Sequence, residues 1–153
     1  MAIEFYSKRT LYSELSNFSN HAFEIDGKHY PTVEHYFQAM KFPGHEQAET
    51  IRTADNPMVA KQLGRTRKVP LRSDWEAVKL DIMRDAVRAK FTTHPELREL
   101  LLGTGDETLV EAAPRDYFWG CGAKKTGQNW LGKILMEVRD ELRNAPVGNE
   151  SDE

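Results

Sequence analysis

The sequence predicts a mainly α domain of the α+β class, compact and helical, with a small β element near its N-terminus. Three patterns indicate this fold: apolar residues recur at helical spacing, capping signals precede those stretches, and Asp26 followed by Gly27 is a strong hairpin signal. The chain has 153 residues, which suits one domain with a buried core. We expect one domain over residues 1–143 and a flexible acidic tail over residues 144–153.

Local signals mark the boundaries of most elements. Thr32 is the expected N-cap of the first helix, and Asn56 before Pro57 starts a later one. Ser73 and Glu76 match a capping box at the start of the longest helix. The expected elements are strands at 3–6, 22–25 and 28–30, helices at 32–42, 46–53, 57–64, 73–91 and 93–102, a β segment at 108–112, a glycine-rich loop at 117–127 and a helix at 129–142.

Composition and charge argue against several classes of protein. The net charge is −3, and Glu150, Asp152 and Glu153 of the tail account for all of it. The neutral body lacks the basic field of a sequence-independent nucleic-acid binder. The chain has one cysteine, Cys121, no apolar stretch near the roughly 20 residues of a membrane span, and no visible signal peptide. We therefore expect a cytoplasmic protein with no membrane association and no obligate protein partner.

The densest chemical signal lies on the helix expected at residues 32–42. Glu34, Gln38 and Lys41 recur at helical spacing, so they share one face. They lie beside an apolar stripe that includes Tyr36. An acid and an amine beside a buried stripe suit the wall of an active site, whereas an ordinary amphipathic helix would leave them in solvent.

A second signal is the run of three aromatic residues between Asp116 and Gly120, which ends in Trp119. Aromatic faces hold a heterocyclic base, at about 1–3 kcal/mol for each stacking contact. A glycine lets the backbone approach a ligand closely. The alternative is that some of these rings belong to the core.

Two further segments suit the other parts of a nucleotide. Five basic residues lie between Lys61 and Arg72, and such a run either clamps a phosphate or forms a solvated loop. Asn17 and Phe18 lie in a small polar loop that suits ribose hydroxyls. The histidines show no metal-ligand spacing, and no phosphate loop or dinucleotide fingerprint is present. We expect neither a metal nor a cofactor.

Taken together, these segments resemble the YbiA-like or NADAR family. The resemblance covers roughly residues 3–142 in the family's order, and the block around Glu34 is long and specific. The motifs that carry it are Leu15-Ser16-Asn17-Phe18, Tyr30-Pro31-Thr32-Val33-Glu34-His35-Tyr36-Phe37-Gln38-Ala39-Met40-Lys41-Phe42, Pro57-Met58-Val59-Ala60, Gly64-Arg65, Pro70-Leu71-Arg72, Trp75, Met83, Ala89-Lys90-Phe91, Leu109-Val110-Glu111, Asp116, Trp119-Gly120 and Leu131-Gly132.

The resemblance implies a YbiA-like fold and an N-glycosidase. Family members are associated with phosphoribosylated riboflavin-pathway intermediates and with ADP-ribose attached to guanine, as nucleotide or in DNA. The loop over residues 121–127 departs from the family's pattern and leaves the choice of substrate open. The expected catalytic residues are Glu34, Asp116 and Lys41. The expected substrate-binding residues are Trp75, Asn17, Phe18, Tyr36, Gln38, Arg65, Arg72, Trp119 and Gly120.

We favour the riboflavin intermediate, because the chain is a stand-alone domain with a neutral body. Removal of ADP-ribose from guanine is the alternative, and a non-catalytic module that binds ADP-ribose or a nucleotide is the rival class. A carboxylate near C1 would stabilise an oxocarbenium-like state while the second acid protonates the base. Alternatively, Lys41 would form a Schiff base with a ring-opened sugar. We expect Glu34, Trp75 and Asp116 to line one cleft.

We also expect the basic loop to reach the mouth of that cleft, because both candidate substrates carry phosphate on ribose. At least one of its four side chains should point there and hold the phosphate. These four side chains are Arg65, Arg67, Lys68 and Arg72.

Overall fold

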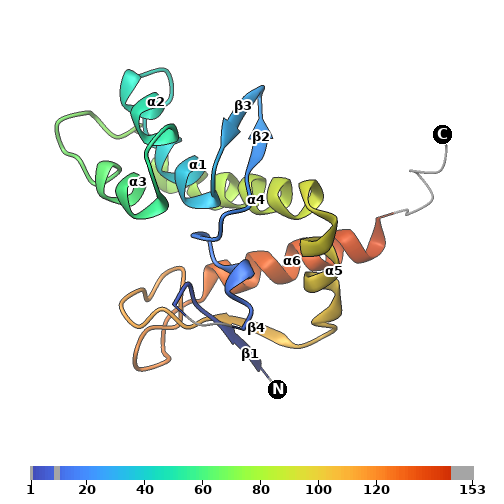
Figure 1. The fold of residues 1–153 in the computed structure, drawn as a ribbon. Helices are drawn as coiled ribbons and strands as arrows, with labels where there is room; N and C mark the ends of the chain where they lie inside the picture. The colour runs from blue at the N-terminus through green and yellow to red at the C-terminus, as the bar shows by residue number, and fades with distance from the viewer. Residues whose placement is uncertain (1, 9–10, 146–153) are drawn as a thin grey trace, which may run out of the picture.

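A computed structural model describes residues 2–8 and 11–145, in which six α-helices pack about two small two-stranded sheets (Figure 1). The elements are β1 (Ala2–Phe5), the 3-10 helix η1 (Ser13–Leu15), β2 (Phe23–Ile25), β3 (Lys28–Tyr30), α1 (Val33–Ala39), α2 (Glu46–Arg52), α3 (Pro57–Leu63), α4 (Trp75–Thr93), α5 (Pro95–Gly103), β4 (Thr108–Glu111) and α6 (Trp130–Asn144). The mainly α prediction is confirmed. Of the tail predicted over residues 144–153, Asn144 ends α6, and residues 146–153 lie outside the described part of the chain.

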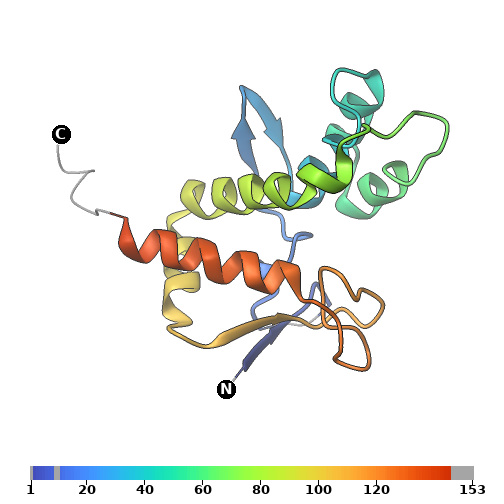
Figure 2. The same ribbon diagram turned by 180° about the vertical axis from the view of Figure 1, so that it is seen from behind.

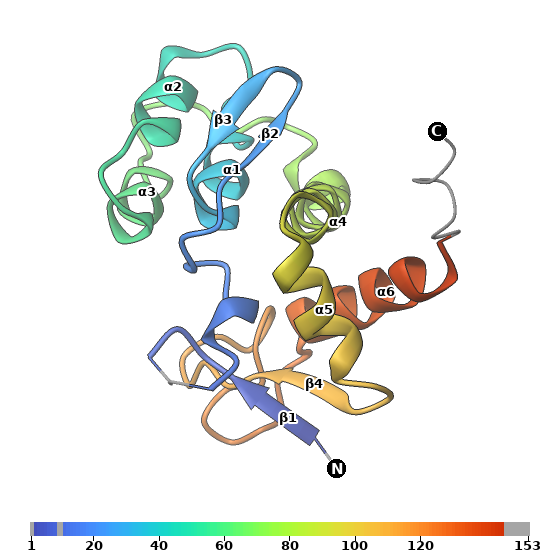
Figure 3. The ribbon, with the colours of Figure 1, turned by 45° about the vertical axis from the view of Figure 1, so that its right-hand side comes forward.

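The β structure has one local and one long-range pairing. β2 and β3 form an antiparallel hairpin, and its turn residues Asp26 and Gly27 have φ angles of 54° and 78°. Both angles are left-handed, as a type I′ turn requires, so the predicted hairpin is confirmed. β1 instead pairs in parallel with β4, so that Phe5 lies opposite Glu111. Figure 3 shows the hairpin and the β1–β4 pair at opposite ends of the domain.

α1 is the central helix of the half that holds the hairpin. Thr32 caps it, because the Thr32 Oγ1 accepts from the backbone N–H of His35 at 3.1 Å. The His35 ring joins Thr32 to the Ala54 carbonyl at the end of α2. α2, α3 and α4 all pack on α1, and every residue of α1 is buried. The helix is therefore enclosed rather than amphipathic.

The long helix α4 begins differently from the prediction. Asp74, not Ser73, occupies the N-cap position, and its side chain makes no capping hydrogen bond. The Asp74 carboxylate instead binds Arg72 through two contacts of 2.7 and 3.1 Å. The predicted capping box is therefore wrong, because a loop arginine holds the Asp74 side chain outside the helix. α5 also begins at Pro95 rather than residue 93, since proline favours the first helical position and His94 is extended.

The helices α4 and α6 lie side by side across the back of the molecule (Figure 2). The ion pairs Arg84–Glu137 and Arg88–Glu141 join them at the surface, both at 2.8 Å. Exposed pairs of this kind contribute little stability, so the apolar contacts beneath them hold the helices together. Among the described residues, no helix is long and apolar enough to cross a membrane.

Candidate active site

Glu34 lies inside the protein, in the first turn of α1. The Gln38 Nε2 donates to the Glu34 Oε2 at 2.6 Å, and the Glu34 N–H donates to the Asn17 carbonyl at 3.1 Å. Only 7% of Glu34 is exposed, and burial raises the pKa of its carboxyl. The negative charge of Asp116 acts in the same direction, whereas the Gln38 hydrogen bond and two lysine charges oppose it. A buried acid whose pKa is raised in this way is a candidate for proton transfer.

Gln38 packs against the end of α3. Its Nε2 is held by Glu34, but the buried Oε1 has no hydrogen-bond partner among the described residues. A Cβ atom at Gly64 would lie 1.9 Å from this Oε1. The absence of a side chain at Gly64 therefore makes room for Gln38.

Lys41 lies just after α1, close to the same glycine. Its Nζ donates to the Gly64 carbonyl at 3.3 Å and sits 5.8 Å from the centroid of the Trp75 ring. Burial lowers the pKa of the Lys41 amine, Glu34 opposes this shift, and Arg65 reinforces it. A lowered pKa increases the fraction of neutral amine, which is the nucleophilic form.

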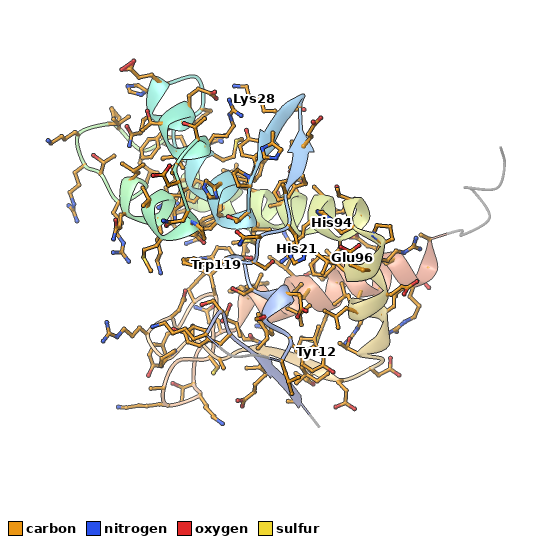
Figure 4. The ribbon with its side chains drawn as sticks, viewed as in Figure 1. Tyr12, His21, Lys28, His94, Glu96 and Trp119 are labelled. Carbon is orange, nitrogen blue, oxygen red and sulfur yellow. The ribbon has the colours of Figure 1, made fainter. Side chains whose placement is uncertain are left out.

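Trp75, Phe37, Trp119 and Phe118 form an aromatic wall between α1 and the loop that follows β4. The Phe37 ring lies 5.0 Å from that of Trp75 and 5.3 Å from that of Trp119, between centroids. Phe118 continues the series at 4.8 Å from Trp119. Figure 4 places Trp119 between the loop that follows β4 and the group of helices α1–α3. Trp75 is buried, so its ring is part of the hydrophobic core as well as of the candidate site.

Asp116 organises the loop that follows β4. Its Oδ1 accepts from the backbone N–H groups of Phe118 at 3.0 Å and Trp119 at 2.8 Å. A Cβ at Gly120 would lie 3.0 Å from the backbone oxygens of both Asp116 and Glu111. Gly120 therefore has a packing role, because it brings the loop down onto the end of β4. Its predicted contact with substrate stays a prediction.

Charge interactions connect two further residues with Glu34: Glu111, to which the sequence assigned no role, and Lys61, the first cation of the basic run. Glu111 ends β4 and is buried, and burial together with the charges of Asp116 and Glu34 raises its pKa to about 8. The Nζ of Lys61, on α3, lies 5.9 Å from the centroid of the Phe18 ring. The positive charge of Lys61 acts on both Glu34 and Glu111. The sequence signal that could have indicated Glu111 is its position, because it is an acidic residue at the end of a short apolar strand.

The structure separates Tyr36 from the other expected site residues. Tyr36 is two positions from Glu34 on a helix, so the two side chains leave α1 on opposite sides. The Tyr36 ring packs at 4.9 Å on Tyr30 and at 6.2 Å on Phe23, and burial raises its pKa to about 12. Its position is that of a core residue.

The basic loop reaches the cluster at one end. The charge of Arg65 acts on Lys41, whereas Arg72 binds Asp74 and donates to the Met40 carbonyl. Arg65, Arg67 and Lys68 are all exposed. Of the four loop residues proposed for phosphate, Arg65 acts on Lys41 through its charge, and the Arg72 backbone N–H donates to the Lys41 carbonyl at 3.1 Å.

The charge of Asp116 acts on Glu34, and the Trp75 ring lies near the Lys41 amine and the Phe37 ring. That these residues line one cleft stays a prediction. A hollow of about 450 Å³ has Phe18 in its lining, but not Glu34, Lys41, Trp75 or Asp116. Its lining residues are Ser7, Ser13, Glu14, Phe18, Ser19, Asn20 and His21. Within residues 2–8 and 11–145, no group of three or more His, Cys, Asp or Glu side chains is placed to hold a metal ion.

Comparison with known proteins identifies the family. The family model described as NADAR domain matches residues 4–143. The chain belongs to the NADAR domain family. This NADAR domain is 52% identical to an N-glycosidase of Nostoc punctiforme over 94% of each chain. It is 49% identical to the N-glycosidase YbiA of Escherichia coli, over 92% of this chain and 88% of the relative. It is thus an N-glycosidase, a hydrolase of N-glycosyl bonds.

The fold agrees with a solved structure of the family. The NMR structure of E. coli YbiA superposes with a TM-score of 0.86, at 45% sequence identity over 99% of this chain and 88% of that one. The chain is also 39% identical to a chloroplastic riboflavin biosynthesis protein of Zea mays, over 92% of this chain but 25% of the maize protein. The region that matches this chain is therefore one part of that larger protein.

Proposed function

We propose that this NADAR domain hydrolyses the N-ribosidic bond of phosphoribosylated riboflavin-pathway intermediates. The similarity to riboflavin biosynthesis proteins of Zea mays and Vibrio vulnificus supports this substrate class. The observation that carries the proposal is the electrostatic link of the buried Glu34 with Lys41 and Asp116, beside an aromatic wall. This arrangement combines acid–base groups with a surface for a heterocyclic base.

The bond dictates what the site must do. Positive charge grows on the sugar as the C1–N bond breaks, and a carboxylate near C1 stabilises it. Burial raises the pKa of the Glu34 carboxyl, whereas the Gln38 hydrogen bond and the charges of Lys61 and Lys41 oppose that shift and favour the ionised form that this role requires. In the same position Glu34 accepts a proton from the attacking water.

Lys41 offers a second route at the same centre. A ring-opened ribose exposes an aldehyde at C1, which a neutral amine attacks to form a Schiff base. The lowered pKa of Lys41 favours this route, and Glu34 would then move the protons. Both routes use the same substrate and the same two side chains.

Lys61 and Arg65 are suited to the substrate phosphate. Both carry a positive charge that acts on the residues at the centre of the cluster. A phosphate held between them would fix the ribose beside Glu34 and Lys41. Binding of this kind contributes equally to the ground state and the transition state.

A side-by-side assay tests the proposed substrate. The purified protein is given a phosphoribosylated aminopyrimidine in one reaction and guanine-linked ADP-ribose in another, and kcat/KM is measured for each. We expect the aminopyrimidine to have the higher value. A higher value for guanine-linked ADP-ribose would overturn the substrate assignment and leave the N-glycosidase activity in place.

A further inference from the structure

Lys90 on α4 is a buried lysine to which the proposed reaction gives no role. Only 1% of the residue is exposed. Its Nζ donates to the Glu14 carbonyl at 2.5 Å and to the Ser16 carbonyl at 2.9 Å. Glu14 lies in η1, and Ser16 is the residue that ends it. Because a buried amine is costly unless it is hydrogen-bonded, these contacts fix the lysine and the turn to each other.

Asn17 follows this turn directly and contacts two helices. Its carbonyl accepts the backbone N–H of Glu34 at 3.1 Å, in the first turn of α1. Its side-chain Nδ2 donates to the Met83 Sδ at 3.6 Å, on α4. Met83 and Lys90 are seven positions apart, so they lie on one face of α4. α4 therefore holds the segment over residues 14–17 at two points, and this segment supports the backbone of Glu34.

We propose that Lys90 is a positioning residue for Glu34. This inference rests on the proposed function. The N–H groups in the first turn of a helix have no partner inside that helix, and the Asn17 carbonyl supplies one for Glu34. Lys90 sets where this carbonyl lies, because it holds the adjoining Ser16 carbonyl. A displacement of about 1 Å in an active site can cost about 10²-fold in rate, so the placement of this backbone matters for the reaction.

The contact holds in either protonation state of the amine. Burial lowers the pKa of Lys90 to about 7, and the charges of Glu14 and Glu111 oppose this shift. A neutral amine keeps two N–H groups, one for each carbonyl. We therefore expect Lys90 to hold the turn without acting as a pH switch.

The test compares kcat, KM and the amide hydrogen exchange of Glu34, measured by NMR, in the wild type and Lys90→Met, with the phosphoribosylated aminopyrimidine as substrate. Methionine resembles lysine in length, but it has no N–H to donate. We expect kcat to fall about 10- to 10²-fold with little change in KM, because Glu34 acts in the transition state. The Glu34 amide should exchange about tenfold faster, whereas amides in the middle of α6 should be unchanged. Wild-type values of both kcat and Glu34 exchange would overturn the proposal, and so would a change in only one of them.

A double variant distinguishes positioning from a general loss of structure. If Lys90 acts through Glu34, Lys90→Met should cost little further activity in the Glu34→Gln background. A merely structural role would lower kcat by the same factor in both backgrounds, and that result would overturn the proposal. Lys28→Met is the matched control, because it makes the same change on β3 at a side chain that is 54% exposed. Wild-type kcat and wild-type Glu34 exchange are expected for it.

Lys90→Arg covers the case in which the methionine variant does not fold. Arginine keeps N–H donors for both carbonyls, so we expect kcat and Glu34 exchange closer to those of the wild type. A fall in kcat with wild-type exchange at Glu34 would count against the proposal. Failure of both variants to fold would make Lys90 a residue of the fold alone and would overturn the proposal as well.

Glu34→Gln separates this inference from the proposed function. If Glu34→Gln is inactive while Lys90→Met keeps wild-type kcat, only the role of Lys90 fails. If both variants keep wild-type activity, the proposed site itself is wrong. The exchange measurement needs no substrate, so it tests the link from Lys90 to Glu34 even if the aminopyrimidine is not hydrolysed.

Discussion

The contact between Gly64 and Gln38 allows a sharp test of how the site is packed. Gly64 has an ordinary right-handed backbone with φ of −70°, so alanine causes no backbone strain there. Its Cβ would nevertheless lie 1.9 Å from the Gln38 Oε1 and 2.7 Å from the Cδ. The glutamine side chain must move, and its 2.6 Å hydrogen bond to Glu34 is then lost.

Two costs add in the Gly64→Ala variant. Overpacking of a well-packed interior costs about 1–3 kcal/mol. Loss of a hydrogen bond to a charged group costs about 1.5–3 kcal/mol. We therefore expect Gly64→Ala to lower the free energy of unfolding by about 2.5–6 kcal/mol. Activity should fall as well, because Glu34 loses the donor that orients it.

Urea unfolding of single and double variants measures this effect. Gln38→Ala removes the obstructing atoms, so Gly64→Ala should cost much less in that background than in the wild type. Gly103→Ala is the control, because a Cβ at Gly103 meets nothing within 4 Å and alanine favours a helix. Equal costs of Gly64→Ala in both backgrounds would refute the proposed clash.

Three further predictions concern charge. The pKa of Glu111 is raised to about 8, so the free energy of unfolding should decrease as pH rises from about 4.5 to 8. Burial lowers the pKa of Lys90 to about 7, so the free energy of unfolding should also decrease as pH falls from about 10.5 to 7. Urea unfolding should thus show minimum stability near pH 7–8, whereas a steady trend across that range would contradict this. Arg65→Ala should raise KM more than it lowers kcat, and Arg67→Ala should change KM less; unchanged KM in Arg65→Ala would contradict the phosphate role. If Lys41 acts by a Schiff base, borohydride should trap the sugar on the protein during turnover, and Lys41→Arg should be inactive without an adduct, since arginine remains protonated. An active Lys41→Arg variant would exclude the covalent route.

Local signals predicted much of the fold, because capping and turn chemistry depends on a few adjacent residues. Thr32 caps α1 and Asn56 caps α3, each through its own side chain. Asp26 and Gly27 adopt the left-handed conformation that their hairpin requires. The signal failed at Ser73, where a contact between neighbouring side chains removed the expected cap.

Contacts between distant parts of the chain could not be predicted in this way. The pairing of β1 with β4 joins residues more than one hundred positions apart, and it places Glu111 opposite Phe5 at the end of β4. Helical spacing correctly grouped Glu34 with Gln38, which share a hydrogen bond. The same spacing could not show that Tyr36 faces the hairpin, because α1 is buried on all sides.

The family resemblance implied Glu34, Trp75 and Asp116 as site residues, without their geometry. The structure adds what these side chains contact: Glu34 binds Gln38, and Asp116 binds its own loop. It also adds Lys61, whose charge reaches two buried carboxyl groups. These are long-range relations, which depend on the packing of α1, α3 and the loop rather than on any motif.

In the proposed reaction, Glu34 performs the chemistry of bond cleavage. Glu34→Gln keeps the shape of the side chain and removes the ionisable group, and Glu24→Gln makes the same change at an exposed position on β2. Turnover of the phosphoribosylated aminopyrimidine and its binding by calorimetry are measured for both variants. We predict that Glu34→Gln loses about 10²- to 10⁴-fold in kcat and binds the substrate nearly as the wild type does, whereas Glu24→Gln is unchanged. Normal turnover by Glu34→Gln would contradict the catalytic role of α1.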